Sequence, residues 1–277
     1  MTTIAAALRE AIGSLPDGMD RIDAEYLLAH VLQRPRAWLY AHADDELAPV
    51  HRDAFRNLQV RRKAGEPVAY LTGLRGFWSL ELRVTSDTLI PRPETELLVE
   101  TALALLHPER TATVLDLGTG SGAVALAIAV ERPLAQVTAV ERSPAALAVA
   151  KDNAQRLKLE RVNFETGNWY EGFGGHRFDV IVSNPPYIED GDTHLDHGDL
   201  RYEPRTALVS GLDGLDDIRQ IIVQAPGYLL PGGWLLLEHG WQQGAAVRGL
   251  LEGAGFREIM TELDLEGRDR VSLGRID

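Results

Sequence analysis

Phe178-Asp179-Val180-Ile181-Val182-Ser183-Asn184-Pro185-Pro186-Tyr187-Ile188 is a mostly apolar run that ends in two prolines and a tyrosine. Such a run predicts a buried strand, and the prolines end it because each lacks a backbone N–H and fixes φ. We therefore expect a rigid, extended corner after the strand. Open α/β sheets bind ligands at the carboxyl ends of their strands, so the Asn184 amide, the proline carbonyls and the Tyr187 ring are candidate ligand contacts.

A second motif, Asp116-x-Gly118-x-Gly120-x-Gly122, follows a strand predicted from residue 114. Glycines let the backbone turn sharply and approach a ligand, and a predicted helix at 123–130 starts just beyond them. The spacing differs from the G-x-G-x-x-G fingerprint for a pyrophosphate. Asp116 can either hold a cationic amine or position the turn itself.

Strands and helices alternate from this turn to the end of the chain, which predicts an α/β fold with a mostly parallel, doubly wound sheet. The last two predicted strands lie close enough in sequence to form an antiparallel pair. The further strands are expected at 136–140, 162–165, 234–238, 256–263 and 270–276, and the further helices at 144–157, 216–229 and 243–252. With the two strands above, the sheet has seven strands.

The first 73 residues have apolar side chains at helical spacing in three segments, 4–12, 22–32 and 54–60. This pattern predicts a small all-helical domain over 1–73. Its helices are expected to end near Gly13 and Gly65, with Asp20 as the N-cap of the second. The pattern alone leaves open whether this domain is a structural cap or has a role in binding.

The spacing of apolar residues changes to two from Gly76, with Trp78, Leu80, Leu82 and Val84 on one side. This alternation predicts a half-buried strand in a β-hairpin linker over 74–90. A helix is expected from Pro93 to about residue 106. The third predicted domain, 91–277, contains both motifs.

Composition is that of a globular protein, with 45% hydrophobic and 25% charged residues in a chain of 277. Runs of about 18 apolar residues are absent, as is a basic and then apolar leader, so we expect neither a membrane span nor a signal peptide. The chain contains no cysteine, which excludes disulfides and thiolate metal sites and fits a cytoplasmic protein.

Charge is distributed unevenly along the chain. The net charge is −13; residues 1–73 have 9 basic and 10 acidic side chains, and the remainder has 19 basic and 31 acidic ones. Proteins that bind a phosphate backbone need the opposite sign. We therefore expect no direct binding of nucleic acid.

Glu141 ends the strand after the glycine-rich turn. A carboxylate at this place can accept hydrogen bonds from both hydroxyls of an unphosphorylated ribose. Alternatively, it is a solvated residue that caps the helix beginning at Pro144. Together with the glycine-rich turn, the ribose interpretation is favoured, and it implies a cofactor that contains adenosine.

The Asn-Pro-Pro-Tyr corner suits the chemistry of a planar nitrogen. An amide or aromatic amine is a poor nucleophile because its lone pair is delocalised. The side-chain oxygen of Asn184 and a proline carbonyl can each accept one N–H of such a group and orient it, while Tyr187 can stack on it. No ionised base is needed, so the rate of methyl transfer would come from proximity and orientation.

These motifs resemble those of class I S-adenosylmethionine-dependent N-methyltransferases. More narrowly, the chain resembles the HemK/PrmC family, the glutamine N5-methyltransferases of bacterial peptide chain release factors. The narrower resemblance rests on the segments Leu89–Glu96, Asp116–Gly122, Val182–Ile188, Tyr202–Leu208, Leu237–Gly240 and Gly267–Arg270.

The resemblance implies roles for individual residues. Asp116 and the turn Gly118, Thr119, Gly120, Ser121 and Gly122 would bind the methionine part of S-adenosylmethionine, Glu141 the ribose, and Trp169 would lie beside the adenine. Asn184 and Pro185 would bind the substrate glutamine amide, and Pro186 and Tyr187 would complete the pocket. The family commonly has aspartate where this chain has Glu141, so we expect the affinity for the cofactor to be tuned and not lost.

The reaction that the resemblance implies is methylation of the glutamine in the Gly-Gly-Gln motif of class 1 release factors, with S-adenosylhomocysteine as the other product. It implies a class I Rossmann-like domain, a helical domain that docks the release factor, and a cytoplasmic enzyme, expected to be a monomer. A nucleic-acid N6-adenine methyltransferase is the main rival, because the same corner suits the amine of adenine, but the acidic charge argues against it. A regulatory protein without catalysis is a second rival, against which the intact residues 184–187 argue.

Two other groups of residues carry less weight. The acidic loop 189–199 has carboxylates and imidazoles that can ligate a metal, but methyl transfer from a sulfonium requires none, and we expect a solvated, mobile substrate loop. Glu238 and His239 end a predicted strand. As a pair they can indicate acid–base chemistry, but a structural or pocket-wall role is favoured.

Overall fold

The computed structural model describes residues 2–13 and 21–277. The chain forms two compact units, which are described separately. The helical unit comprises Met1–Leu74 and Asp196–Tyr202, and the sheet unit comprises Arg75–Leu195 and Glu203–Asp277. Asp20, the predicted N-cap, lies outside the described residues.

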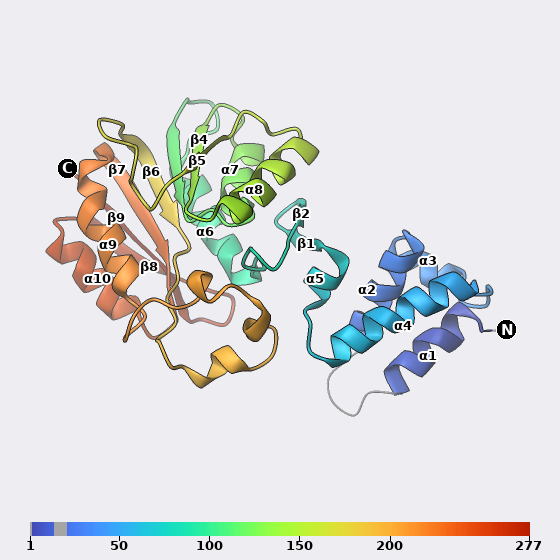
Figure 1. Ribbon diagram of the computed structural model, residues 1–277. Helices are drawn as coiled ribbons and strands as arrows, with labels where there is room; N and C mark the ends of the chain where they lie inside the picture. The colour runs from blue at the N-terminus through green and yellow to red at the C-terminus, as the bar shows by residue number, and fades with distance from the viewer. Residues whose placement is uncertain (1, 14–20) are drawn as a thin grey trace. The chain divides into compact units, whose positions relative to one another are not determined.

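The sheet unit contains a seven-stranded sheet in the order β5-β4-β3-β6-β7-β9-β8 (Figure 1). The strands are β3 Thr113–Leu117, β4 Gln136–Glu141, β5 Asn163–Thr166, β6 Phe178–Ser183, β7 Leu229–Glu238, β8 Arg257–Leu263 and β9 Asp269–Arg275. Strand β9 runs antiparallel to both of its neighbours, and the other pairs are parallel. The predicted fold class and the terminal antiparallel pair are confirmed.

The order of the strands reverses direction between β3 and β6, which lie side by side at the centre of the sheet. After β3 the chain continues to β4 and β5 on one side, and from β6 it builds the other side. Such a reversal opens a crevice at the carboxyl ends of the two central strands. Both motifs singled out in the sequence follow these two strands.

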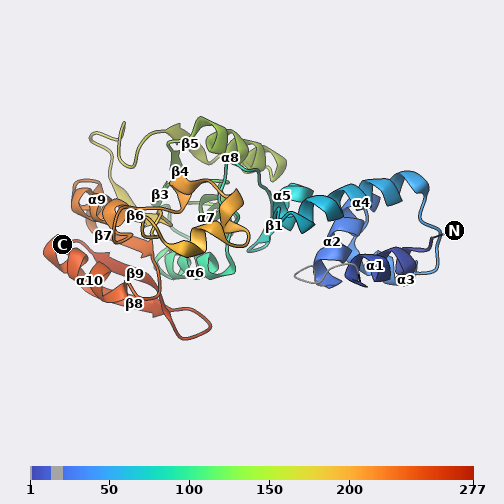
Figure 2. The same cartoon turned by 60° about the horizontal axis from the view of Figure 1, so that its bottom comes forward.

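Helices cover both faces of the sheet (Figures 1 and 2). Strand side chains alternate between two apolar cores, because Val180 and Val182 point into one core while Ile181 points into the other. Both faces are apolar, as in other parallel sheets that are buried on both sides. One core contains α6 Glu96–Leu105, α7 Ala123–Glu131 and α8 Pro144–Arg156, and the other contains α9 Asp216–Gln224 and α10 Gly244–Gly253.

Strands β1 Leu74–Phe77 and β2 Leu80–Arg83 form a hairpin. The expected alternation holds from Leu80, but Trp78 lies in the turn with φ 55° and does not belong to a strand. The Asn153 side chain of α8 accepts a hydrogen bond from Arg83 N at 2.7 Å and donates one to Arg83 O at 2.9 Å. The hairpin is thereby bonded to the helices of the sheet unit.

Two neighbouring predicted boundaries are wrong. The helix expected over 216–229 ends at Gln224, a single turn of 3-10 helix follows (η5 Ala225–Gly227), and β7 begins at Leu229 instead of residue 234. Pro226 lacks the N–H that an α-helix needs. The N–H of Phe178 donates to Tyr228 O at 2.8 Å, and this bond brings the first residues of β7 against β6.

The helical unit contains α1 Ile4–Gly13, α2 Arg21–Leu32, α3 Arg36–Ala41, α4 Pro49–Lys63 and α5 Val68–Thr72. Three of these match the predicted helices. Helices α3 and α5 were not predicted, because six and five residues are too few to show a helical period. Gly65, with φ 99°, follows α4 as expected of a glycine at a helix end. Among the described residues, no helix is long and apolar enough to cross a membrane.

Candidate active site

The crevice at the centre of the sheet contains a cavity of about 200 Å³, and every residue that lines it belongs to the sheet unit. The motif residues among them are Gly118, Gly120, Glu141, Trp169, Asn184 and Pro186. A smaller cavity of about 50 Å³ shares some of this lining and is also bordered by Asp116, Thr119 and Ser121. The two motifs predicted from the sequence therefore meet in one place.

The glycine-rich turn between β3 and α7 depends on backbone conformations that favour glycine. Gly118, Gly120 and Gly122 have φ values of 73°, 57° and 87°. A Cβ atom on Gly118 would lie 3.2 Å from Cζ3 of Trp169. Residue 118 must therefore be glycine for two reasons: its φ is positive, and a side chain there would press against Trp169.

Asp116 is buried at the end of β3, with 2% of its surface exposed. Its Oδ2 accepts hydrogen bonds from Thr119 Oγ1 at 2.6 Å and from the N–H of Ala125 at 3.2 Å. Burial raises the pKa of Asp116 to about 6, although both hydrogen bonds favour its charged form. Of the two interpretations from the sequence, positioning the turn is observed, and the carboxylate also borders the smaller cavity.

Glu141 links the glycine-rich turn to the start of α8. Its Oε2 accepts from Gly120 N at 3.0 Å and its Oε1 accepts from Ser143 N at 2.9 Å. Helix α8 is capped by the Ser143 hydroxyl, which accepts from Ala146 N, and not by Glu141. A carboxylate has about four acceptor positions, so one position on each oxygen remains for a ligand in the cavity.

Trp169 lies in the loop after β5 with φ 54° and is 7% exposed. It packs in the same core as Leu117 and Val140 and also lines the larger cavity. An indole face at this edge can cover a planar apolar group such as a purine.

At the corner after β6, the side chains of residues 184–187 make different contacts. The Asn184 amide nitrogen donates to Thr95 Oγ1 at 3.1 Å, so its Oδ1 is the atom left to accept a hydrogen bond. Pro185 is buried, and Pro186 lines the larger cavity. The Tyr187 hydroxyl donates to Glu238 Oε1 at 3.1 Å. In the described part of the chain, neither Pro185 nor Tyr187 lines these two cavities.

Several residues around the cavity were not predicted from the sequence. Thr95 ends η1, the single turn Pro93–Thr95, and is 4% exposed. Glu203 is equally buried, accepts from Ile90 N at 2.9 Å and forms an ion pair with Arg92. Their segments carry the family resemblance, but nothing in their residue types indicates which side chain turns inward.

The acidic loop 189–199 is partly bonded. Asp192 accepts from His194 Nδ1 at 2.7 Å, Asp190 lies 3.6 Å from Arg205, and Asp199 pairs with Arg62 within the helical unit at 3.2 Å. Among the described residues, no group of three or more histidines and carboxylates is arranged to hold a metal ion.

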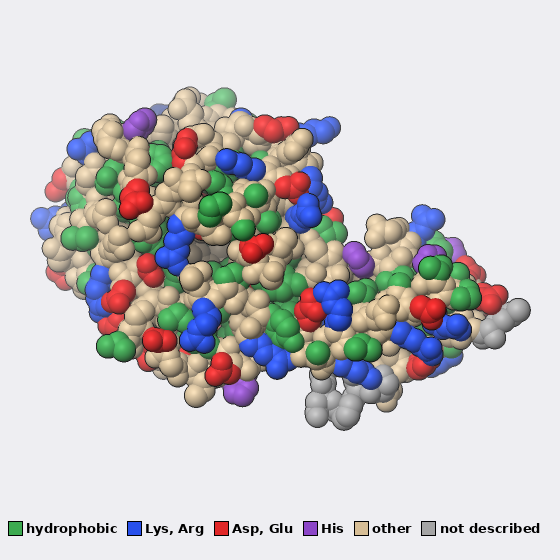
Figure 3. All heavy atoms as spheres, viewed as in Figure 1, with side chains coloured by type: hydrophobic (Ala, Val, Ile, Leu, Met, Phe, Trp, Pro, Cys, Tyr) green, Lys and Arg blue, Asp and Glu red, His purple; other side chains and the backbone are tan. Residues whose placement is uncertain are grey.

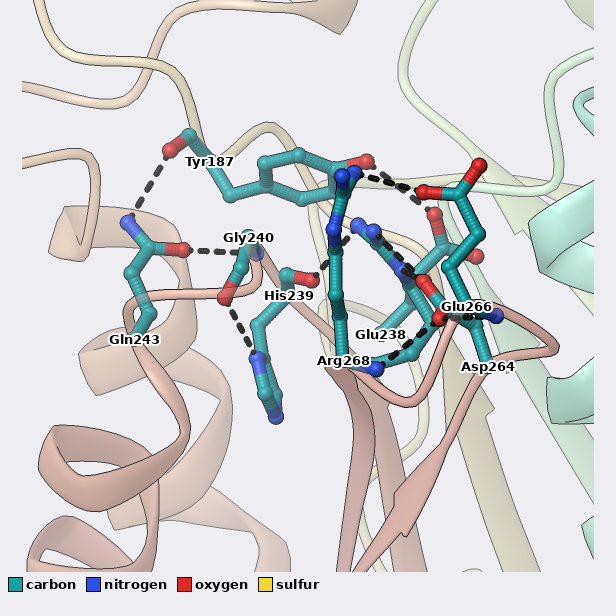
Figure 4. Close-up of polar contacts among 9 residues, drawn as sticks. Tyr187, Glu238, His239, Gly240, Gln243, Asp264, Glu266 and Arg268 are labelled. Carbon is teal, nitrogen blue, oxygen red and sulfur yellow. Dashed lines mark hydrogen bonds and ion pairs between the residues drawn. The ribbon is translucent and has the colours of Figure 1, made fainter.

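His239 is fully buried. Its Nδ1 lies 2.9 Å from Gly240 O and its Nε2 lies 2.8 Å from Ser272 Oγ, and burial lowers its pKa. Figure 4 shows its ring turned away from Glu238 and Tyr187. The structural role favoured from the sequence fits this placement.

Known proteins resemble the chain over its whole length. Residues 5–73 match the PrmC N-terminal domain, and residues 93–199 match the methyltransferase small domain. A release factor glutamine methyltransferase of Xylella fastidiosa is 55% identical and covers 95% of this chain and 96% of its own. The one of Pseudomonas aeruginosa is 54% identical and covers 99% of both chains.

Among solved structures, the 16S rRNA N2 G1207 methyltransferase of T. thermophilus, in complex with AdoMet and guanosine, superimposes with a TM-score of 0.54. It is 23% identical and covers 74% of this chain and 50% of its own. At this identity the likeness concerns the fold alone.

Proposed function

The chain belongs to the release factor glutamine methyltransferase family, and we propose that it methylates N5 of the glutamine in the Gly-Gly-Gln motif of class 1 release factors. It is an S-adenosylmethionine-dependent enzyme, and S-adenosylhomocysteine is the second product. The observation that best supports the proposal is the hydrogen bond from Asn184 to Thr95, because it leaves an acceptor oxygen at the cavity, where a substrate amide needs one.

The lining of the two cavities fits the cofactor. Glu141 keeps acceptor positions for ribose hydroxyls, Trp169 offers a face to adenine, and Asp116 borders the smaller cavity, where a carboxylate suits the ammonium of a methionine group. Thr119 and Ser121 border the same cavity. S-adenosylmethionine supplies a methyl group on a positively charged sulfur, and no metal is required for its transfer.

Asn184 holds the substrate amide in our proposal. Its Oδ1 accepts one N–H of the glutamine NH₂ group. The Pro185 carbonyl, which lines neither cavity within the described chain, accepts the other when the corner adjusts to the substrate. Both bonds draw the nitrogen lone pair out of conjugation and aim it at the cofactor methyl. The side chains need not take the proton, since the nitrogen becomes acidic once it carries the methyl, so the rate comes from orientation.

We infer that Tyr187 supports the corner through hydrogen bonds and does not stack on the substrate. Its hydroxyl bonds to Glu238 and its carbonyl accepts from Gln243 Nε2 at 3.0 Å. These bonds hold the corner at its C-terminal side, while Pro186 forms part of the cavity wall. We assign to Tyr187 the role of fixing the corner.

Each predicted domain has a separate role in our proposal. We propose that residues 1–73 dock the release factor, that the hairpin in 74–90 links this region to the enzyme, and that 91–277 carries out methyl transfer. We also propose that the enzyme acts as a monomer. Because release factors act in translation, we propose that the enzyme is cytoplasmic.

A nucleic-acid substrate is not favoured. The chain has 41 acidic against 28 basic residues, and Figure 3 shows both signs interspersed over the visible face of the sheet unit. Proteins that bind a phosphate backbone gather basic side chains on one face.

Transfer of label tests the proposal. Purified enzyme is incubated with S-adenosylmethionine carrying a labelled methyl group and with a class 1 release factor whose motif glutamine is intact or replaced. Label on the intact factor alone supports the proposal. Equal labelling of both factors would contradict the assigned target.

A further inference from the structure

A buried carboxylate lies behind the corner, outside both cavities. Glu238 ends β7, is 1% exposed, and does not line either cavity within the described chain. Its Oε1 accepts from Tyr187, and within the described residues its Oε2 has no hydrogen bond of good geometry. Figure 4 shows the Tyr187 hydroxyl turned toward this carboxylate. Buried carboxylates without full partners are uncommon.

Glu238 reaches the cavity through Thr95. The Thr95 hydroxyl lies near enough to the Glu238 carboxylate to favour its charged form, although no hydrogen bond of good geometry joins the two groups in the described structure. The same oxygen, Thr95 Oγ1, accepts the hydrogen bond from the Asn184 amide nitrogen at 3.1 Å. The polar groups of Glu238, Thr95 and Asn184 therefore follow one another, and the bond between Thr95 and Asn184 is formed in this structure.

The direction of hydrogen bonds along this chain depends on the charge of Glu238. A threonine hydroxyl has one proton to donate, and an ionised carboxylate can only accept. With Glu238 ionised, Thr95 donates to it and offers a lone pair to the NH₂ group of Asn184. The Oδ1 atom of Asn184 then faces the substrate, as an acceptor must.

Protonation of Glu238 removes this constraint. A neutral carboxyl can donate to Thr95, and the Thr95 proton is then free to turn toward Asn184. The Asn184 amide can reverse and present its NH₂ group to the substrate, which also offers NH₂. Two donors cannot pair, so this arrangement binds the substrate amide poorly.

We propose that Glu238 is a positioning residue whose negative charge, relayed by Thr95, sets the orientation of the Asn184 amide. This inference rests on the proposed function, because it assumes that Asn184 Oδ1 accepts from the substrate. It adds a role for two residues that contribute no side chain to the reacting atoms.

The surroundings of Glu238 bring its change of protonation near neutral pH. Burial raises the pKa of Glu238 to about 7, and Thr95 and Tyr187 act against that shift. The charged groups that face Glu238 are Arg270 from β9, which favours its ionised form, and Glu94 from η1, which opposes it. Arg92 faces the Tyr187 hydroxyl. The rate of methyl transfer should thus fall as pH decreases through about 7.

Two variants at residue 95 separate positioning from packing. Thr95→Val keeps the shape and removes the hydroxyl, and we expect kcat to fall about tenfold or more, with little change in the Kd for S-adenosylmethionine. Thr95→Ser restores the hydroxyl and should recover most of the lost rate. Equal rates for the two variants would overturn the proposal.

A spectroscopic measurement avoids dependence on turnover. The side-chain NH₂ resonance of Asn184, identified by its loss in Asn184→Ser, should shift with pH around 7 in the full chain. Glu238→Gln should abolish that shift and the acidic fall in kcat, while the exposed control Glu266→Gln keeps both. A resonance that is constant with pH in the wild type contradicts the relay.

The two proposals fail in different ways. If the wild type transfers no label to a release factor, the proposed function is wrong, whatever the resonance does. If it transfers label and Thr95→Val has the wild-type rate, only the relay is wrong. Should Glu238→Gln not fold, the pair at residue 95 decides the outcome.

Discussion

Asn184 is the residue on which the proposed chemistry depends. Its nitrogen is held by Thr95, and its oxygen is assigned to the substrate. We expect Asn184→Ala to lower kcat about 100-fold or more, since it removes an acceptor that acts on the reacting nitrogen. The Kd for S-adenosylmethionine, measured by calorimetry, should change about threefold at most.

Asn163→Ala is the matched control, because Asn163 is exposed on β5 and, among the described residues, its side chain bonds only with that of Glu165. Its kcat should equal that of the wild type. An Asn184→Ala enzyme with full kcat and a large loss of cofactor affinity would mean that Asn184 has been given the wrong role.

Asp116 gives a prediction about pH. Its pKa is about 6 in the folded protein and lower in the unfolded chain, so the folded state binds the proton more tightly. Stability of the wild type therefore decreases as pH rises from about 4 to about 6. Asp116→Asn can keep both hydrogen bonds on one oxygen and removes this effect, so its Tm relative to wild type should be higher at pH 8 than at pH 4.

The same variant loses the charge assigned to the methionine ammonium, so its affinity for S-adenosylmethionine should fall about tenfold or more. Asp152→Asn, half-exposed on α8, serves as the control for both measurements. If Asp116→Asn binds the cofactor as tightly as the wild type, Asp116 only positions the turn and does not bind the methionine ammonium.

At the scale of elements, the turn between β3 and α7 can be tested with a pair of glycines. Gly118→Ala and Gly120→Ala impose similar strain at positive φ, but only at Gly118 does a Cβ come within 4 Å of another residue, Trp169. Each should lose about 1 kcal/mol of stability for the backbone. Gly118→Ala should lose more, measured by urea denaturation, and equal losses would argue against a tight contact with Trp169.

Elements with a strong pattern were predictable. The strand Phe178–Ser183 was recognisable because an apolar run met two prolines, and the turn because three glycines alternate. The start of β7 was not, because residues 229–233 contain a proline and two glycines. Their strand character comes from tertiary pairing, of Leu229 with β6 and of residues 232–233 with Ile276. Helices α3 and α5 are shorter than two turns, so tertiary packing defines them.

Some residues of the candidate site were predictable from the sequence and others were not. Residues with special backbone or chemistry, such as Glu141 and Asn184, were found from sequence and line one cavity. Thr95 and Glu203 were missed because their importance lies in where η1 and the loop after residue 195 bring them. A threonine and a glutamate in loops have no distinctive pattern until their burial is known.

At the scale of the whole molecule, net charge gives a prediction about nucleic acid. A chain with a net charge of −13 should not bind duplex DNA even at low salt, because too few cations are available to release counterions. We expect no retardation of DNA in a gel at about 50 mM salt and no inhibition of release factor methylation by added DNA. Competition between DNA and the release factor would count against a protein substrate.

Mass spectrometry of the methylated product tests the central claim most directly. The enzyme, S-adenosylmethionine with a labelled methyl group, a class 1 release factor and unmethylated DNA are combined in one reaction, and each macromolecule is digested and analysed. The account predicts one labelled methyl on the side-chain amide of the glutamine in the Gly-Gly-Gln motif. Label on adenine in the DNA and none on the release factor would contradict it.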